Sequence, residues 1–422
     1  MPHPRSWTVA LIALGLFLLP GFVASSAQAP ENESKHGADE HPAAPDPNRE
    51  HAIELYKQGK FVQAMPLFEK LVADHPADAG VRESFAYCIL LHAGTLSDPE
   101  LRKKARVRAR NVALEAKALG DTSQLLQVIL DTPEDGTEPT YSNRKDVDDI
   151  MKSAEADFFR GDRDKARQGY ERALLLDPQN YDAALFIGDV YFKQHILGGA
   201  GEWFAQAIKI DPNRETAYRY WGDALVAMGK EDEARSKFID AIVADPYNRR
   251  SSTGLTNWLE RNKLTLNTVQ LKDAAAVDRK DDQHINITLD SNSLGKNDPN
   301  GAAWMMYSMN RALWNGDKFK KEFPGEPKYR RTLKEEVDCL SVMISVLKES
   351  KDYKKKQKHL DPGLQGLIKI QEAGFLEPFV LFSRADNDIA KDYAPYRDAH
   401  RENVRRYLDD FLVPKAPPAT AK

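Results

Sequence analysis

The sequence predicts an all-α fold in which helix-turn-helix units stack into a solenoid, followed by a mostly helical C-terminal extension. Three consecutive windows, 147–180, 181–214 and 215–248, superpose without a gap, so this part of the chain has a 34-residue period. Each window closes on an Asp-Pro pair, within LLLDPQN, IKIDPNR and IVADPYN. Small and aromatic residues recur at fixed offsets in all three windows. A fixed period of this length is typical of proteins that stack helical hairpins.

Composition narrows the class of protein. The chain has 422 residues, with 60 Lys plus Arg against 64 Asp plus Glu and a net charge of −4. This balance lacks the basic excess of a nucleic-acid-binding protein. Hydrophobic residues make up 41% and charged residues 29%, which is typical of a soluble, helix-rich chain rather than a multi-span membrane protein. Two cysteines support neither a disulfide framework nor a cysteine-based zinc site.

Residues 1–27 have the features of a secretory signal peptide. Arg5 precedes an unbroken apolar stretch, residues 9–19, which as a helix would cover about 16 Å of a hydrocarbon core about 30 Å thick. The small residues that follow predict cleavage after Ala27, which leaves Gln28 as the first residue. We therefore expect an exported protein, periplasmic or extracellular. The alternative is an uncleaved N-terminal segment that anchors the protein to a membrane.

The next segments lead into the repeats. Residues 28–47 predict a disordered linker, because Pro, Ala, Glu and Asp dominate and no aliphatic residue larger than Ala occurs. Residues 48–120 predict two less regular repeats. Pro66 falls inside the second helix of the first of these, where proline is expected to kink the helix. The other has an insertion, HAGTLSDPE, between its helices.

An interruption and a cap flank the regular array. Residues 121–146 predict an irregular helix and a turn-rich loop, TPEDGTEPTYSN. The three tandem repeats occupy residues 147–248. Residues 249–264 are expected to form a capping helix, since a terminal repeat otherwise exposes its apolar face.

The recurring residues have a structural explanation. A small residue in the first helix lets the two helices of a unit approach closely. A small residue in the second helix, with an aromatic four residues later on the same face, fills the space between them. Asp-Pro ends the second helix because the residue before proline avoids helical geometry. The residues assigned to this packing are Ala166, Tyr170, Ala173, Pro178, Gly188, Ala200, Phe204, Ala207, Pro212, Gly222, Ala234, Phe238, Ala241 and Pro246.

The period, the small and aromatic offsets and the closing Asp-Pro together resemble the tetratricopeptide repeat. The resemblance implies a right-handed solenoid in which the first helix of each pair lines a concave groove. It also implies that this groove takes peptides or extended segments of other proteins. The residues expected to face the groove are Met151, Glu155, Phe158, Phe159, Leu185, Asp189, Phe192, Lys193, Arg219 and Asp223.

Three of these residues, Glu155, Asp189 and Asp223, occupy the same position in the three windows and would form an acidic ladder along the groove. One hypothesis is that the ladder attracts a partner segment that is apolar with basic residues and is anchored on the groove phenylalanines. The other is that the acids cap or pair with neighbouring helices, for example through Arg219. Related adaptors that clamp a terminal carboxylate use Asn with Lys or Arg in such places, and that pattern is absent.

Residues 265–415 depart from the repeat template. INITL predicts a short strand, and the polar residues around it predict loops. Apolar spacing predicts helices over 301–314, 328–349, 362–373 and 390–412. This region is interpreted as a helical extension docked on the array or as a second helical domain. Residues 416–422 predict a disordered tail.

No motif for catalysis, phosphate binding or metal binding occurs in the sequence. His195, in a repeat turn, is interpreted as structural. Cys88 and Cys339 are expected to be separate buried thiols, with a disulfide as the alternative. We therefore expect a non-enzymatic scaffold or adaptor in the cell envelope that binds another protein or peptide segment, without nucleic acid or cofactor. The alternatives are an enzyme with a site in residues 265–415 and a structural assembly factor that self-associates.

Overall fold

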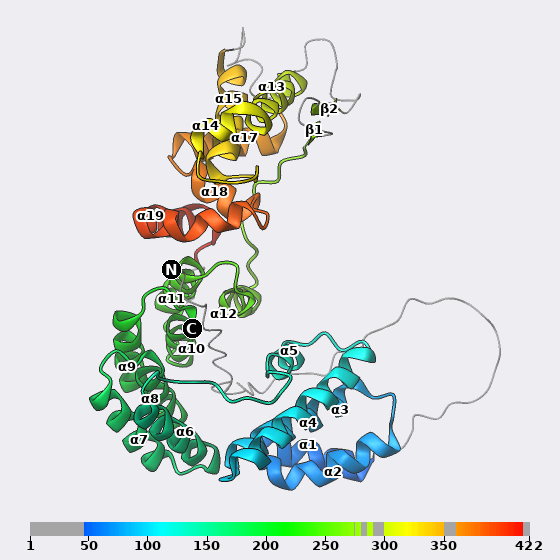
Figure 1. The fold of residues 1–422 in the computed structure, drawn as a ribbon, viewed down its shortest axis with the longest axis vertical. Coiled ribbons are helices and arrows are strands. Elements are labelled where there is room, and N and C mark those ends of the chain that lie inside the picture. The colour runs from blue at the N-terminus through cyan, green and yellow to red at the C-terminus, as the bar shows by residue number, and fades with distance from the viewer. Residues whose placement is uncertain (1–45, 274, 280–284, 290–298, 350–359, 417–422) are drawn as a thin grey trace, which may run out of the picture. The chain divides into compact units, whose positions relative to one another are not determined.

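The computed structural model describes residues 46–273, 275–279, 285–289, 299–349 and 360–416 (Figure 1). The predicted signal peptide, all but the last two residues of the predicted linker and all but the first residue of the predicted tail lie outside the described residues. The chain divides into two compact units, one ending at Ile210 and the other beginning at Asp211. We call them unit 1 and unit 2.

Unit 1 is helical, as the sequence predicts. Its helices pack in sequential pairs, α1 on α2, α3 on α4, α6 on α7 and α8 on α9, with the short α5 against α3 and α4. The bounds are α1 (Pro47–Lys57), α2 (Phe61–Asp74), α3 (Ala79–Thr95), α4 (Pro99–Ala118), α5 (Gln124–Leu130), α6 (Lys145–Arg160), α7 (Arg163–Leu176), α8 (Tyr181–Lys193) and α9 (Leu197–Ile210).

Side-chain caps set where several of these helices begin. The carboxylates of Asp46, Asp78 and Asp98 accept backbone N–H bonds at the starts of α1, α3 and α4, which satisfies donors that have no partner within the helix. Proline stands directly after the cap in α1 and α4, where its missing N–H costs nothing. Pro66 lies inside α2, which continues through it to Asp74.

The repeat period extends one helix beyond the three regular windows. The first helices α8, α10 (Glu215–Ala227) and α12 (Arg249–Asn262) begin one period apart, at positions 181, 215 and 249. The turn after each first helix contains a residue with positive φ at the same spacing, namely Gly161 at 88°, His195 at 60°, Gly229 at 72° and Lys263 at 54°. This left-handed conformation ends a helix. It gives His195 a structural role, and it makes α12 a first helix in register with the repeats.

Close contacts between small residues and rings hold the paired helices together. A Cβ on Gly188 of α8 would lie 2.6 Å from the ring of Phe204 in α9, so only glycine allows this approach. Gly222 of α10 stands in the same relation to Phe238 of α11 (Glu231–Ala244), at 2.5 Å. The alanines and aromatics of the second helices that the sequence assigned to packing are at most 1% exposed. The second helices α7, α9 and α11 end directly before Asp-Pro.

Unit 2 joins the last repeat helices to the C-terminal region. Its elements are α10, α11, α12, β1 (Ala275–Arg279), β2 (Ile285–Leu289), α13 (Pro299–Leu313), the π-helical turn η2 (Trp314–Lys318), α14 (Phe319–Glu322), α15 (Leu333–Glu349), α17 (Pro362–Glu372), α18 (Leu376–Ser383), the 3₁₀ turn η4 (Ile389–Asp392), α19 (Tyr393–Tyr407) and the π-helical turn η5 (Leu408–Leu412). One hydrophobic core runs from α11 and α12 into these C-terminal helices.

Unit 2 contains elements that the sequence did not predict, among them β1, η2, α14 and α18. Residues 275–279 form β1, which pairs antiparallel with β2, although this segment was expected to be a loop. AAVDR has little strand propensity of its own, so its extended conformation depends on pairing with INITL. The short α18 was not predicted, because LEPFVLFS is brief and its apolar residues show no helical periodicity.

The start of α19 is anchored on the end of α11. The hydroxyl of Tyr393 donates to the carbonyl of Val243 at 2.7 Å, and the guanidinium of Arg397 donates to the carbonyl of Ala244 at 2.6 Å. These are the last two residues of α11, whose carbonyls have no donor within the helix. A cation at a helix C-terminus also interacts favourably with the helix dipole.

The turn η5 and the residues after it are held by a buried arginine of α11. Arg235 donates to the carbonyls of Asp409, Val413 and Pro414 at 2.7, 2.6 and 2.9 Å, and pairs with the Asp409 carboxylate. The C-terminal region is thereby fixed along the outer helix of the last repeat.

Replacing Gly188 by Ala tests the close approach of the paired helices. We expect the free energy of unfolding to fall by about 1–3 kcal/mol, because the added methyl group overpacks the contact with Phe204. Gly198→Ala in α9 is the matched control, since its Cβ would meet no atom within 4 Å. That change should stabilise the protein by about 0.5–1 kcal/mol. Urea unfolding measures both, and equal effects of the two changes would contradict the packing assignment.

Candidate protein-interaction site

The structure buries two residues that were expected to face a groove. Met151 and Leu185 are both 0% exposed, so the prediction that they line an open surface is wrong. Helical spacing identifies the face of a helix, but it cannot tell whether neighbouring elements of the chain cover that face. Both residues therefore belong to the packed interior of unit 1.

Two acids of the predicted ladder are also buried. Glu155 is 8% exposed and Asp189 is 5% exposed. Glu155 accepts a hydrogen bond from the hydroxyl of Tyr170, which is itself buried. Burial raises the pKa of Glu155 to about 8, with Asp189 and Asp182 adding to the rise. Glu155 is therefore largely protonated at neutral pH and supplies no negative charge to a solvent-facing ladder.

The other charged positions of the predicted groove have partners or partial burial. Burial raises the pKa of Asp189 to about 6, against the opposing effects of Lys193 and Arg163. In unit 2, Asp223 is half-buried, and burial raises its pKa to about 6 as well. Arg219 pairs with Glu215 one helical turn away, with its Nε 2.9 Å from a carboxylate oxygen. The predicted exposed acidic ladder is therefore wrong: Glu155 and Asp189 are buried and Asp223 is half-buried.

The remaining predicted groove residues are half-buried. Phe159 packs against α3, because a Cβ on Gly94 would lie 2.6 Å from its ring. Phe158 meets Phe159 edge to face, with ring centroids 6.0 Å apart. Phe192 and Lys193 lie at the end of α8 and are partly accessible. Phe158, Phe192 and Lys193 thus keep part of their surface available to a partner.

Residues 131–144, which connect α5 to α6, lie against α4. We call this segment the strap. Arg102, Arg106 and Arg110 of α4, spaced four residues apart, hold it. Arg110 donates to the carbonyl of Thr132 at 3.2 Å, Arg106 to those of Gly136 and Thr137 at 3.2 and 3.4 Å, and Arg102 pairs with Glu138 at 2.9 Å. The strap therefore runs antiparallel to α4.

The far end of the strap is held by the repeats. The backbone N–H of Tyr141 donates to Asp148 of α6 at 2.8 Å, and Asn180 at the start of α8 donates to the carbonyl of Tyr141 at 3.0 Å. The Tyr141 ring meets Phe186 of α8 edge to face, with centroids 5.7 Å apart. Burial raises the pKa of Tyr141 well above its ordinary value, and the nearby carboxylates add to the rise, Glu155 first.

The sequence did not predict the contacts that hold the strap. The arginine spacing on α4 was a usable signal, because residues four apart share one helix face. A solvated basic face would show the same spacing, however, so the sequence does not tell the two apart. Asp148 and Asn180 carry no distinguishing pattern, since their partner is the backbone of a loop.

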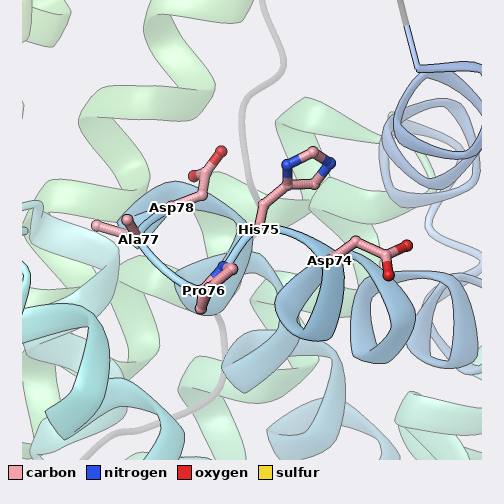
Figure 2. A pocket seen from close by; sticks show the side chains of 6 residues that line it. Asp74, His75, Pro76, Ala77 and Asp78 are labelled. Carbon is pink, nitrogen blue, oxygen red and sulfur yellow. The ribbon is translucent and has the colours of Figure 1, made fainter.

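A hollow of about 650 Å³ lies at the turn between α2 and α3, lined by residues 74–79. Figure 2 shows the side chains of Asp74, His75, Pro76, Ala77 and Asp78 around it. Its polar groups already serve the helix starts: Asp78 accepts from the N–H of Val81 at 3.0 Å, and His75 lies 3.4 Å from Asp46. The hollow is therefore a consequence of helix capping.

A buried charge network occupies the C-terminal region of unit 2. Glu336 accepts hydrogen bonds from Tyr307 at 2.8 and 3.0 Å, from Arg331 at 2.7 Å and from Arg384. Burial raises the pKa of the neighbouring Glu335 to about 7. Because both oxygens of Glu336 are occupied, the network ties α13, α15 and α18 together rather than presenting that carboxylate to a substrate.

Several other predicted features fall within the described residues. Cys88 and Cys339 are free and buried, as expected. No group of three or more His, Cys, Asp or Glu side chains in the described parts of the chain is placed to hold a metal ion. Within the same ranges, no helix has the length and apolar character needed to cross a membrane.

Comparison with known proteins identifies the repeats. Residues 151–215 match the family model described as tetratricopeptide repeat. This part of the chain consists of tetratricopeptide repeats. The match begins in α6 and ends at the first residue of α10. It includes Asn180, which binds the strap, but not Asp148. No curated protein matches the chain in sequence.

Several solved structures resemble the chain at low similarity. MamA shares 18% identity, covering 47% of this chain and 96% of its own, with a TM-score of 0.25. YrrB, titled a TPR protein with an unusual peptide-binding site, shares 15% over 52% and 91%, with a TM-score of 0.25. The TPR2AB-domain:pHSP90 complex of yeast Sti1 shares 16% over 50% and 93%, with a TM-score of 0.26. Similarity at this level does not establish a shared arrangement of repeats or a shared ligand.

Replacing Glu155 by Gln tests its buried protonation. A proton bound up to about pH 8 in the folded state, against an ordinary value of 4.5, stabilises the fold at low pH. That contribution is lost as pH rises through about 8, at no more than about 1.4 kcal/mol per pH unit. The free energy of unfolding of the wild type should fall between pH 6.5 and 8.5, and we expect Glu155→Gln to make this fall smaller. This pH range lies above the one in which Asp189 titrates.

The matched control is Glu171→Gln on α7, whose side chain is 39% exposed and pairs with Arg167. It should leave the slope of stability against pH unchanged. Urea unfolding at several pH values gives both slopes. Equal slopes for the wild type and Glu155→Gln would show that Glu155 is not the buried acid described above.

Proposed function

We propose that this protein is an exported scaffold that binds an extended segment of another protein in the cell envelope through its tetratricopeptide repeats. One observation carries the proposal: the side chains of Asp148 in α6 and of Asn180, which caps α8, bind both backbone polar groups of Tyr141 in a segment that forms neither helix nor strand. A surface that binds backbone groups in this way can hold an extended chain. The partly accessible Phe192 and Lys193 of α8 add an apolar contact and a charge for a partner.

Export is the second part of the proposal. It is supported by the apolar stretch at residues 9–19, the preceding Arg5 and the small residues up to Ala27. The small number of cysteines does not conflict with an oxidising compartment, since the two thiols are buried and free.

Photo-crosslinking from position 192, in protein purified from the envelope fraction, tests the proposal. We expect an adduct with a second protein and a mature chain that begins at Gln28. Phe192→Ala should reduce recovery of that partner at least fivefold, because partly buried aromatic residues commonly anchor interfaces. Leu175→Ala is the matched control: Leu175 is 81% exposed on the second helix α7 and should not affect recovery.

The competing functions give different outcomes. An adduct only with a second copy of the chain would favour self-association and contradict the scaffold proposal. If no crosslinked protein is found and the purified chain begins at Met1, both the binding and the export are contradicted.

A further inference from the structure

We infer that strap residues 137–142 occupy the face of α6 and α8 that the proposed partner uses, and that the partner supplies an extended segment with a carboxylate three residues before a tyrosine. This inference rests on the proposed function. It identifies the chemistry of the partner from the segment of this chain that is bound at the same face.

The strap is held in the way that a peptide ligand is held. No backbone group of residues 137–143 bonds to the backbone of another described residue. Three of its backbone atoms are bound instead by side chains of the surrounding helices: Arg106 binds the carbonyl of Thr137, while Asp148 and Asn180 bind Tyr141. Such contacts depend on an extended conformation and not on covalent connection, so a segment of another chain can make them equally well.

Two side chains of the strap provide the specificity. Glu138 pairs with Arg102 at 2.9 Å, and the Tyr141 ring packs on Phe186 with centroids 5.7 Å apart. They are three residues apart, so a partner needs a carboxylate and an aromatic ring at the same spacing. Pro139 lies between them and favours an extended backbone in the residue before it, which is Glu138 itself.

The surroundings of the Tyr141 hydroxyl exclude a charged substitute. Burial is the main cause that raises the pKa of Tyr141, and the nearby Glu155 and Asp182 raise it further. Burial would leave a phosphate or a carboxylate at this position poorly hydrated, and the nearby carboxylate of Asp182 would repel it. The partner tyrosine must therefore be unmodified.

The strap is covalently linked to the face that it occupies, and this linkage favours binding of the strap over binding of a free partner. A segment linked to its own site acts at an effective concentration on the order of millimolar. A free peptide of the same sequence must then compete with the strap, so its apparent affinity for the wild type is reduced. Weakening the strap should reveal the affinity of the empty face.

Binding of a labelled peptide of residues 133–143 to the full chain, followed by fluorescence anisotropy, tests the inference. We expect Tyr141→Ala to bind this peptide at least tenfold more tightly than the wild type does. Peptides that carry Glu138→Ala, Tyr141→Ala or phosphotyrosine should bind Tyr141→Ala protein at least tenfold more weakly than the unmodified peptide.

The matched variant adds Asn180→Asp to Tyr141→Ala. Asp keeps the side-chain oxygen that accepts from the N–H of Ala183 at the start of α8, but it loses the amide that donates to the carbonyl of Tyr141. The fold should be preserved, as judged by circular dichroism, and the tight peptide binding should be lost. If Tyr141→Ala fails to fold, Glu138→Ala replaces it in the assay, because that change weakens the strap by removing only its pair with Arg102 and leaves Tyr141 in place.

The outcomes separate this inference from the proposed function. One outcome is that protein variants with a weakened strap leave the peptide unbound while crosslinking from position 192 still captures an envelope protein. In that case the partner uses another face, and only this inference fails. If neither the peptide nor an envelope protein is bound, the proposed function fails as well. Equal binding of the peptide and its Tyr141→Ala form would also overturn the assigned chemistry.

Discussion

The packing of a phenylalanine ring against a glycine sets the spacing of two of the three regular helix pairs, α8 with α9 and α10 with α11, and the positions of the α8 residues that hold the strap depend on it. Phe204 against Gly188 and Phe238 against Gly222 bring each second helix to a distance that any Cβ would prevent. In unit 1 this contact fixes α8 against α9. It thereby fixes the positions of Asn180 and Phe186, which form part of the binding face. The recognition surface is thus a consequence of helix packing rather than of flexible loops.

The balanced net charge conceals an uneven distribution of charge. In unit 1, α4 presents three arginines to the strap, whereas α6 and α8 place Asp148, Asp182 and Glu155 on its other side. Burial makes Glu155 a largely neutral acid at pH 7. It can therefore lie beside a tyrosine hydroxyl without the full penalty of an unpaired buried charge. The strap fits between these two charged surfaces because its carboxylate, Glu138, pairs with Arg102 of α4 and its uncharged Tyr141 faces the acids.

Local patterns predicted the helices well and the site poorly. The repeat period located Ala166, Phe204 and the Asp-Pro helix ends, because each has a role inside its own unit. Burial of Met151 depends on which neighbouring element covers it, and the period carries no information about that. Residues 131–144 were predicted correctly as a turn-rich loop. Their binding role was missed because it depends on contacts with residues of α4, α6 and α8. Some of these residues are distant in sequence, and none belongs to a recognisable motif.

The central claim is that Tyr141 is an exchangeable occupant of the face formed by α6 and α8. Hydrogen exchange at the Tyr141 amide of the wild-type protein tests it most directly, because this N–H donates to Asp148. We expect the Tyr141 amide to exchange slowly in the free protein and faster as the 133–143 peptide is added at millimolar concentration. Exchange that stays slow at peptide concentrations which saturate Tyr141→Ala would show that the strap is a fixed part of the fold.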